Sequence, residues 1–518
     1  MSTLCQIYSV ASKHLLKEVE AVRKDPAPFQ AKIFAYLMHH GANTHFGKER
    51  GMKSIRSYRD FQKQVRLHSY EALLPYIEQT RRGAPHILWD QKVTWFAKSS
   101  GTGGTKSKFI PVSFPSLHQC HYKGMRTLLA VYLDNYPNSR LFNGKALTLG
   151  GSCHIDEMGA GKSRYGDLSA ILLSNSPLWA ECFRTPAKSL LLQDDFAKKV
   201  VAVAKKIAGQ NITNFSGVPS WNLVLMRQVL EYSGKNNLLE LWPRLELFIH
   251  GGINFEPYRE QYRRLIPSPE MHYMESYNAS EGFFALQDDP HDSAMLLLPN
   301  CAIFYEFIPL TRLQEALDGT FVHIETVESV QTGVDYAMVI STNGGLWRYL
   351  VGDTVRFATL RPHKILITGR THLFINAFGE ELMIRHAEKA LAEGCAAHGA
   401  VASDFTVAPI FMDGHAKGAH EWLIEFETLP ANLALFAADL DKALCRQNSD
   451  YEAKRANNAT MLPLTLHALE KGCFYHWLEQ KKRLGGQNKV PRLNRTRDYL
   501  EEILAVNEIL RNNRPGAV

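Results

Sequence analysis

The spacing of apolar residues changes twice along this chain of 518 residues, and these changes restrict the folds open to it. Strand-like runs at 92–97, 109–113, 145–150, 245–250 and 271–276 alternate with helical patterns near 115–135, 194–208 and 220–240. Short β-rich segments follow over 294–359, and helices and strands begin again after about residue 370. This order predicts mixed α/β layers followed by a second, smaller α/β domain. We therefore expect domains at residues 1–370 and 371–518, joined by a short hinge.

The N-terminal segment predicts helices of its own. Residues 2–24 carry apolar side chains at three- and four-residue steps, which indicates one amphipathic helix ended by Asp25-Pro26. A second helix is expected from about Phe29 to His40.

Charge and cysteine usage exclude several classes of protein. The chain has 59 basic and 52 acidic residues, and seven of the basic ones lie between Lys481 and Arg497, where there is no acid. The other 501 residues are formally neutral, so no nucleic-acid partner is predicted. The eight cysteines lie at least 28 residues apart, which fits no zinc or disulfide pattern, and no apolar run approaches membrane-spanning length. We expect a soluble cytoplasmic enzyme without a membrane partner, of undetermined oligomeric state.

A loop rich in glycine and hydroxyl groups, Ser99-Ser-Gly-Thr-Gly-Gly-Thr-Lys-Ser-Lys108, joins two of the strand-like runs. Glycines let a backbone wrap a polyphosphate, hydroxyl groups donate to its oxygens, and a lysine neutralises it. The loop is not a Walker A motif, because Thr105 precedes Lys106 where that motif has glycine. Its residues alone fit a phosphate loop and a solvated turn equally well, and the loop lysine is Lys106 or Lys108.

Two further motifs are weaker. Asp156-Glu-Met-Gly-Ala-Gly-Lys-Ser163 ends like a Walker A motif but begins with a carboxylate, which favours an exposed loop. Asn278-Ala-Ser280-Glu-Gly282 differs by one residue from the nucleophile elbow of hydrolases, whose strained turn needs glycine first. No HExxH motif occurs, and no GxGxxG follows a strand.

Two strand-end segments carry nucleotide-like chemistry. In Tyr277-Asn-Ala-Ser-Glu281 the tyrosine could stack on a purine, and the glutamate could hold Mg²⁺ beside phosphates. In Tyr349-Leu-Val-Gly-Asp353 the aspartate could accept both hydroxyl groups of a ribose. Each segment taken singly also fits an ordinary tight turn.

These motifs occur together, in the order typical of adenylate-forming enzymes. With Gly217-Val-Pro-Ser-Trp221, His250-Gly-Gly-Ile-Asn-Phe-Glu-Pro-Tyr258 and Gln487-Asn-Lys-Val-Pro-Arg492, the chain resembles the auxin-responsive Gretchen Hagen family of acyl-acid amido synthetases, in particular its bacterial members. The resemblance covers roughly residues 35 to 500. It implies a large N-terminal domain with a β-barrel and two helix-flanked sheets, and a mobile C-terminal α/β domain. It also implies ATP, Mg²⁺, a small carboxylic acid and an amino acid or other amine as partners.

The resemblance further implies roles for individual residues. The phosphates would be bound by Ser99, Ser100, Thr102 and Lys108, and the rest of the nucleotide by Gly252, Tyr277, Ala279, Ser280, Asp353 and Arg370. Glu281 would hold Mg²⁺, and Lys489 would reach the α-phosphate from the small domain. In the family an acyl-adenylate forms first, and its acyl group then passes to the amine.

The acyl substrate cannot be identified from the sequence. The helix after the loop offers Tyr122 and Arg126 as pocket residues, although a solvated helix face is the better interpretation. Three alternatives remain: a thiol acceptor, a binding or regulatory protein that has lost the chemistry, and, more distantly, a hydrolase using Ser280.

Overall fold

The computed structural model describes ten stretches of the chain, which form two compact units. The described residues are 3–100, 107–156, 163–193, 196–253, 255–321, 323–371, 374–413, 417–458, 460–481 and 490–512. The first unit comprises Met1–Ser99, Lys108–Phe255 and Tyr262–Thr371, and the second comprises Ser100–Ser107, Glu256–Gln261 and His372–Val518.

The first unit is built on an eleven-stranded sheet with the order β12-β13-β14-β15-β11-β10-β9-β8-β7-β3-β6. The strands from β12 to β9 pair antiparallel, whereas β9, β8, β7, β3 and β6 run parallel. Strand β9 therefore belongs to both halves. The strands are β3 (Lys145–Thr148), β6 (Arg184–Thr185), β7 (Ile212–Gly217), β8 (Leu247–His250), β9 (His272–Ala279), β10 (Gly282–Leu286), β11 (Met295–Leu297), β12 (Ile303–Pro309), β13 (Asp335–Thr342), β14 (Tyr349–Leu360) and β15 (His363–Arg370).

A separate four-stranded sheet, with the order β2-β1-β5-β4, carries the glycine-rich segment between two of its strands. Its strands are β1 (Val93–Ser100), β2 (Ser107–Ser113), β4 (Cys153–Ile155) and β5 (Arg164–Gly166). Strand β1 pairs parallel with β5. The predicted strands at 92–97 and 109–113 are thus confirmed.

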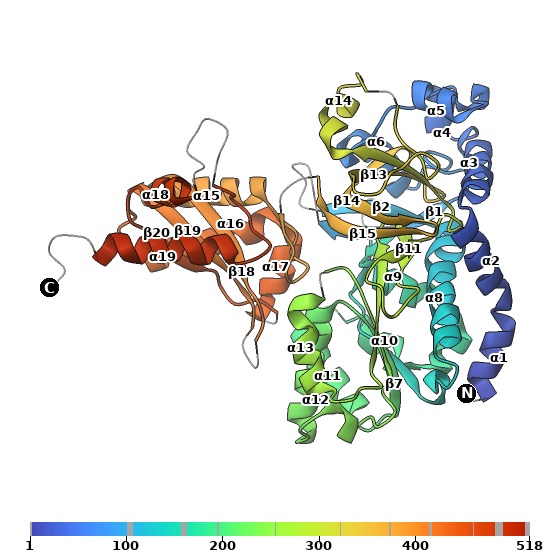
Figure 1. Cartoon of the computed structure of the whole chain (residues 1–518), viewed down its shortest axis with the longest axis horizontal. Coiled ribbons are helices and arrows are strands. Elements are labelled where there is room, and N and C mark those ends of the chain that lie inside the picture. The colour runs from blue at the N-terminus through green and yellow to red at the C-terminus, as the bar shows by residue number, and fades with distance from the viewer. Residues whose placement is uncertain are drawn as a thin grey trace. The chain divides into compact units, whose positions relative to one another are not determined.

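Helices flank the parallel half of the large sheet, as Figure 1 shows for α8 on one side and α11 and α12 on the other. Parallel strands require such crossover helices, and the helices bury the first four residues of β7 and all of β8. The helices of the unit include α1 (Thr3–Ala11), α2 (Lys13–Lys24), α3 (Ala27–Gly41), α4 (His45–Glu49), α5 (Tyr58–Gln64), α6 (Tyr70–Arg81), α7 (Phe114–Ser116), α8 (Tyr122–Asn135), α9 (Leu168–Asn175), α10 (Lys188–Leu191), α11 (Phe196–Ile207), α12 (Pro219–Ser233), α13 (Glu256–Leu265, shared between the units) and α14 (Leu313–Leu317).

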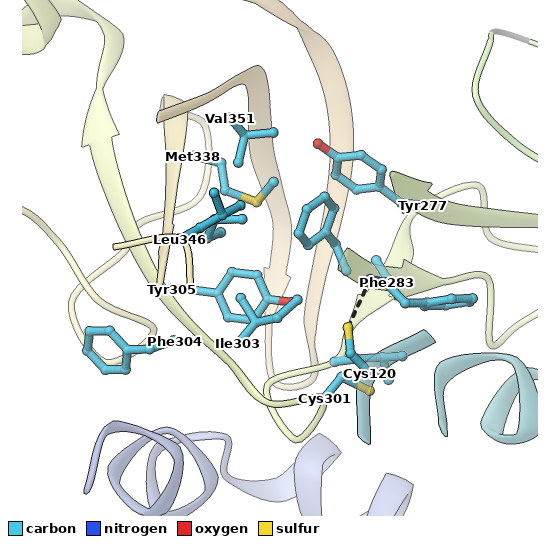
Figure 2. Packing of buried hydrophobic residues seen from close by; sticks show 14 of the residues in the cluster. Cys120, Tyr277, Phe283, Cys301, Ile303, Phe304, Tyr305, Met338, Leu346 and Val351 are labelled. Carbon is cyan, nitrogen blue, oxygen red and sulfur yellow. Dashed lines mark hydrogen bonds between the residues drawn. The ribbon is translucent and has the colours of Figure 1, made fainter. Parts of the chain in front are cut away.

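The main hydrophobic core lies where α3, the helix α7–α8 and the antiparallel strands meet. Figure 2 shows part of it, with Cys120 and Cys301 near each other and Tyr277 and Phe283 from neighbouring strands. These side chains are all buried, which ties the hairpin β9–β10 to the centre of the unit.

The second unit contains the three-stranded sheet β18-β19-β20 and the short hairpin β16–β17. Its hydrophobic cluster includes Leu423, Trp477 and Ile503. The elements are β16 (Phe374–Ile375), β17 (Leu382–Met383), α15 (Ile384–His398), β18 (Val401–Ile410), β19 (Ala419–Thr428), α16 (Leu433–Gln447), α17 (Ser449–Arg455), β20 (Thr465–Leu469), α18 (Cys473–Gln480) and α19 (Asp498–Asn512). The mixed α/β class and the large and small domains are therefore as predicted.

Two expectations need correction. The single helix over 2–24 is two helices, because α1 ends at Ala11 and α2 begins at Lys13. No barrel is closed among the described strands: the large sheet ends at β12 and β6, and the four-stranded sheet at β2 and β4. Within the ten described stretches, no helix has the length and apolar character needed to cross a membrane.

Two buried histidines make the stability of the first unit pH-dependent. His68 donates from Nδ1 to the Trp347 carbonyl (2.9 Å), and burial lowers the pKa of His68 and of His121 to about 4. Since the unfolded value is near 6.5, the unfolded chain binds more protons between pH 4 and 6.5, and stability falls as pH falls. As the pH falls through this range, each histidine is expected to lower the free energy of unfolding by up to about 3 kcal/mol.

Urea unfolding at pH 7.5, 6 and 5 tests this expectation. His68→Gln should reduce the slope of the unfolding free energy against pH, whereas His14→Gln, at an exposed position, should leave it unchanged. Equal slopes in both variants would contradict it.

Candidate active site

The carboxyl ends of β7, β8 and β9 form one edge of the parallel half-sheet, and several of the predicted site residues follow them. The strands end at Gly217, His250 and Ala279. Ligands of open parallel sheets bind outside the carboxyl ends of the strands, which is where these three strands end. Gly252, Tyr277, Ala279, Ser280 and Glu281 therefore lie along one edge of the sheet, and their roles stay predictions.

Close packing of the backbone explains the glycines after β8. A Cβ atom on Gly251 would lie 2.2 Å from the Ser276 carbonyl oxygen, so a larger residue would push the chain away from β9. Gly252 has φ +84°, which glycine adopts without strain. The segment can thus follow the strand edge closely, leaving no side chain at Gly252.

Asp353 joins three separately predicted segments. It lies opposite Arg370 in the β14–β15 ladder, and Arg370 Nε donates to Asp353 Oδ1 (2.6 Å). The Tyr277 hydroxyl donates to Asp353 Oδ2. Burial first, and then the Asp353 carboxylate, raises the pKa of Tyr277 well above its ordinary value, so the phenol remains a donor. The structure therefore brings Tyr277 and Arg370 together on the carboxylate of Asp353.

Lys108 is buried near the start of β2, between two tyrosines. Its Nζ lies 3.4 Å from the Tyr349 hydroxyl and about 6 Å from the ring centroids of Tyr70 and Tyr349. The Phe109 amide donates to the Tyr70 hydroxyl (2.8 Å), which fixes the strand next to the lysine. Lys108 is the loop lysine that the structure describes; Lys106 lies outside the described residues.

Sequence reasoning missed Tyr70 and the contact made by Tyr349. Tyr349 begins the Tyr-x-x-Gly-Asp segment, so the motif itself could have pointed to Tyr349 as a site residue. Tyr70 carried none, because its partner Phe109 lies 39 residues away and belongs to a different element.

Glu281 lies in the two-residue turn between β9 and β10, within the electrostatic reach of Lys108. Burial raises the pKa of Glu281, Lys108 opposes that rise, Asp353 adds to it and Arg370 opposes it. The site thus pairs two cationic with two acidic side chains. Within the described stretches, no group of three or more His, Cys, Asp or Glu residues is arranged to hold a metal by itself.

Part of the predicted phosphate loop lies outside the described residues. Ser99 and Ser100 end β1, with Ser99 half-buried, while the side chain of Ser100 is not described. Thr102 and Lys489 lie outside the described residues. Their roles stay predictions.

The two tentative acyl-pocket residues lie on α8. The Tyr122 hydroxyl donates to the Leu172 carbonyl (2.7 Å), and burial raises the pKa of Tyr122 to about 12. Arg126 is exposed, and its Nε donates to the Tyr122 carbonyl (3.3 Å). The rings of Phe114, His118 and Tyr122 follow one another along this helix at 4.3 and 5.4 Å. The acyl role remains a prediction.

The structure also bears on the two rival motifs. Asp156 is buried and pairs with Arg81 (Nε to Oδ2, 2.7 Å), so its carboxylate already has a cationic partner, which fits the interpretation against a phosphate loop; residues 157–162 lie outside the described part. Ser280 lies in a β-hairpin turn, whereas a hydrolase nucleophile sits between a strand and a helix. A hydrolase using Ser280 is therefore not supported.

Comparisons with known proteins find relatives that match most of the chain. Models described as the GH3 family N-terminal, central and C-terminal domains match residues 15–271, 295–370 and 385–498. The chain is 23% identical to jasmonoyl–L-amino acid synthetase JAR4 of Nicotiana attenuata, over 93% of each protein. It is 22% identical to indole-3-acetic acid-amido synthetase GH3.4 of Arabidopsis thaliana, over 92% of this chain and 91% of that protein.

Solved structures share the fold. AtGH3.15 acyl acid amido synthetase in complex with 2,4-DB superposes with a TM-score of 0.61 at 17% identity, over 96% of each chain. A 2-hydroxyisobutyryl-CoA ligase in complex with 2-HIB-AMP and CoA gives 0.54 at 13% identity, over 94% of this chain and 92% of that chain.

Proposed function

The chain belongs to the GH3 family, and from that membership and the site geometry we propose that it is an ATP-dependent ligase joining a small carboxylic acid to an amino acid. The carboxylate attacks the α-phosphorus of ATP, the bond to pyrophosphate breaks, and an acyl-adenylate forms. The amine then attacks the acyl carbon, and AMP leaves. The single observation that carries the proposal is that Tyr277 and Arg370 both donate hydrogen bonds to the carboxylate of Asp353. This observation is made in a chain that the models of all three family domains match.

The first step brings two anions together, so catalysis depends on charge neutralisation and positioning. Lys108 and Arg370 provide fixed positive charge next to acidic partners on the same unit. We assign Asp353 to the ribose hydroxyl groups, because each carboxylate oxygen keeps a lone pair beyond its bond to Arg370 or Tyr277. Gly252, Tyr277, Ala279 and Ser280 would line the nucleotide along the strand edge, with Ser99, Ser100 and Thr102 near the phosphates.

Glu281 is the residue proposed for Mg²⁺. Mg²⁺ is usually held by one or two carboxylates together with substrate phosphates, which fits a single acid at this edge. Burial raises the pKa of Glu281, which means that its charged form is disfavoured, and a bound cation would stabilise that charged form. When bound, Mg²⁺ would neutralise charge on the phosphates. We further propose residues 1–370 as the nucleotide- and acyl-binding domain and 371–518 as the mobile domain that supplies Lys489.

Acid-dependent exchange of labelled pyrophosphate into ATP, screened over a library of carboxylic acids, tests the function. At least one acid should support Mg²⁺-dependent exchange, and amino acids should then release AMP. Asp353→Asn should raise the KM for ATP about tenfold or more, because a charge-assisted hydrogen bond contributes roughly 1.5–3 kcal/mol.

Asp335→Asn is the matched control. Asp335 lies on β13 and forms an ion pair with Arg356 of β14, the strand that also carries Asp353, but it is not part of the site. No exchange with any acid by folded protein would refute adenylation. Exchange with unchanged KM for ATP in Asp353→Asn would refute the ribose role alone, and AMP release only with CoA would indicate a thiol acceptor.

A further inference from the structure

The helix that packs on the hairpin β9–β10 contains an irregular turn. Residues Leu117–His121 form a π-helical turn between α7 and α8. Such turns are rare and occur frequently at functional sites, because they direct side chains that a regular helix would turn away. Here the turn ends with Cys120 and His121, and both side chains are buried.

These two consecutive residues bind the same rung of the hairpin. Asn278 of β9 lies opposite Phe283 of β10. Cys120 Sγ accepts the Phe283 amide hydrogen (3.2 Å), as the dashed line in Figure 2 shows, and His121 Nδ1 donates to Asn278 Oδ1 (3.0 Å). One strand is therefore held through its backbone and the other through a side chain.

The clamped rung lies next to the turn that carries Ser280 and Glu281. Ala279 and Gly282 form the one rung between them, and beyond Phe283 the register of the ladder shifts before Ala285. The ladder is therefore irregular on the side away from the turn. Backbone pairing with β8 and β11 holds the two strands in the sheet, and Cys120 and His121 add side-chain contacts to the rung beside the turn.

Helix α8 packs closely on the Asn278–Phe283 rung. A Cβ atom on Gly124 would lie 2.4 Å from the Phe283 ring, so glycine alone lets the helix approach it. Burial lowers the pKa of His121 to about 4, which leaves a neutral ring with one N–H to donate. Burial also raises the pKa of the Cys120 thiol, which stays uncharged.

We propose that Cys120 and His121 are positioning residues that hold the Ser280–Glu281 turn in the orientation that binds Mg²⁺ and ATP phosphates. The proposal rests on the function proposed above for that turn. It predicts that loosening either contact weakens the use of Mg²⁺-ATP without changing recognition of the carboxylic acid.

The test compares four variants of the full chain. Cys120→Ala removes the acceptor of the Phe283 amide, and His121→Phe keeps a ring but removes its N–H. His121→Asn is the conservative rescue, because its amide nitrogen can take the place of Nδ1. Cys301→Ala is the matched control: Cys301 is a buried cysteine of the same core, with no bond to the hairpin backbone among the described contacts.

Two measurements are made. Amide hydrogen exchange over residues 276–286, without nucleotide, should become at least about tenfold faster in Cys120→Ala and His121→Phe but not in Cys301→Ala. In the pyrophosphate-exchange assay, the Mg²⁺ concentration for half-maximal rate should rise about tenfold in the same two variants, with the KM for the acid unchanged, and return toward wild type in His121→Asn.

Protection and Mg²⁺ dependence equal to those of Cys301→Ala would overturn the proposal. If the wild-type protein itself catalyses no exchange, the proposed function fails, while amide exchange still tests the clamp. If the Cys120→Ala or the His121→Phe variant does not fold, Cys120→Val and His121→Leu remove the same two contacts with different packing, and hairpin protection unchanged in both would refute the clamp.

Discussion

Replacing Lys489 by alanine is expected to lower the rate of adenylate formation by about 10²-fold or more while leaving ATP binding nearly unchanged. The family resemblance assigns this lysine to the α-phosphate, where negative charge develops as the carboxylate attacks. A positive charge that reaches the phosphates only during the reaction stabilises the transition state more than it stabilises bound ATP. Single-turnover formation of the acyl-adenylate measures the rate, and protection of the protein by ATP against thermal unfolding measures binding.

A neighbouring lysine provides the control. The basic tract around Lys489 is partly neutralised: Lys481 pairs with Glu502 (2.6 Å), Arg492 with Asp404 (3.3 Å) and Arg497 with Glu421 (2.6 Å). Lys481→Ala removes a surface ion pair, which contributes at most about 1 kcal/mol to stability, and should leave the rate unchanged. An unchanged rate in Lys489→Ala, or an equal loss in Lys481→Ala, would show that the catalytic lysine lies elsewhere.

Arg348→Met is expected to destabilise the first unit by about 3–5 kcal/mol, because it leaves Glu306 buried without its cation. Arg348 Nε lies 3.0 Å from both Glu306 oxygens, and Arg348 Nη1 donates to the carbonyls of Val65 (2.7 Å) and Gln62 (3.2 Å). The Tyr58 hydroxyl donates to Glu306 as well (2.8 Å). Urea unfolding of wild type and variant measures the loss.

The double variant Glu306→Leu/Arg348→Met separates pairing from packing. Removing both charges avoids the isolated buried carboxylate, so the double variant should recover most of the stability that the single variant loses. Additive losses would indicate that packing of the two side chains matters more than their charge. Arg348 has φ +43° and precedes Tyr349, so a raised KM for ATP in Arg348→Met would link this pair to the Lys108 environment.

Much of the fold could be predicted from the periodicity of apolar residues. The runs at 145–150, 245–250 and 271–276 correspond to β3, β8 and β9. The break at Ser12 and the π-helical turn at Leu117–His121 could not, because both are local departures that leave the average spacing helical. Whether the implied β-barrel closes could not be predicted either, since closure depends on pairing between distant segments, and none of the described sheets is closed.

The candidate site was predictable as a set of motifs but not as an arrangement. Glycine, hydroxyl, acidic and basic residues at strand ends indicate nucleotide chemistry through their side-chain chemistry alone. Which of them contact one another depends on strand order. Asp353 meets Arg370 because β14 and β15 are neighbours, and it meets Tyr277 across 76 residues of sequence.

The sequence by itself therefore determined the order of helices and strands, the division into a large and a small domain, the family and the candidate residues for the chemistry. These follow from side-chain type and spacing, which are local properties of the chain. Only the tertiary structure decided that Lys108 is buried between Tyr70 and Tyr349, that Asp353 accepts hydrogen bonds from two segments, and that Cys120 and His121 hold one rung beside Glu281. The physical reason is that apolar spacing reports which side chains are buried but not which partner each of them meets, and partners are set by how distant segments pack.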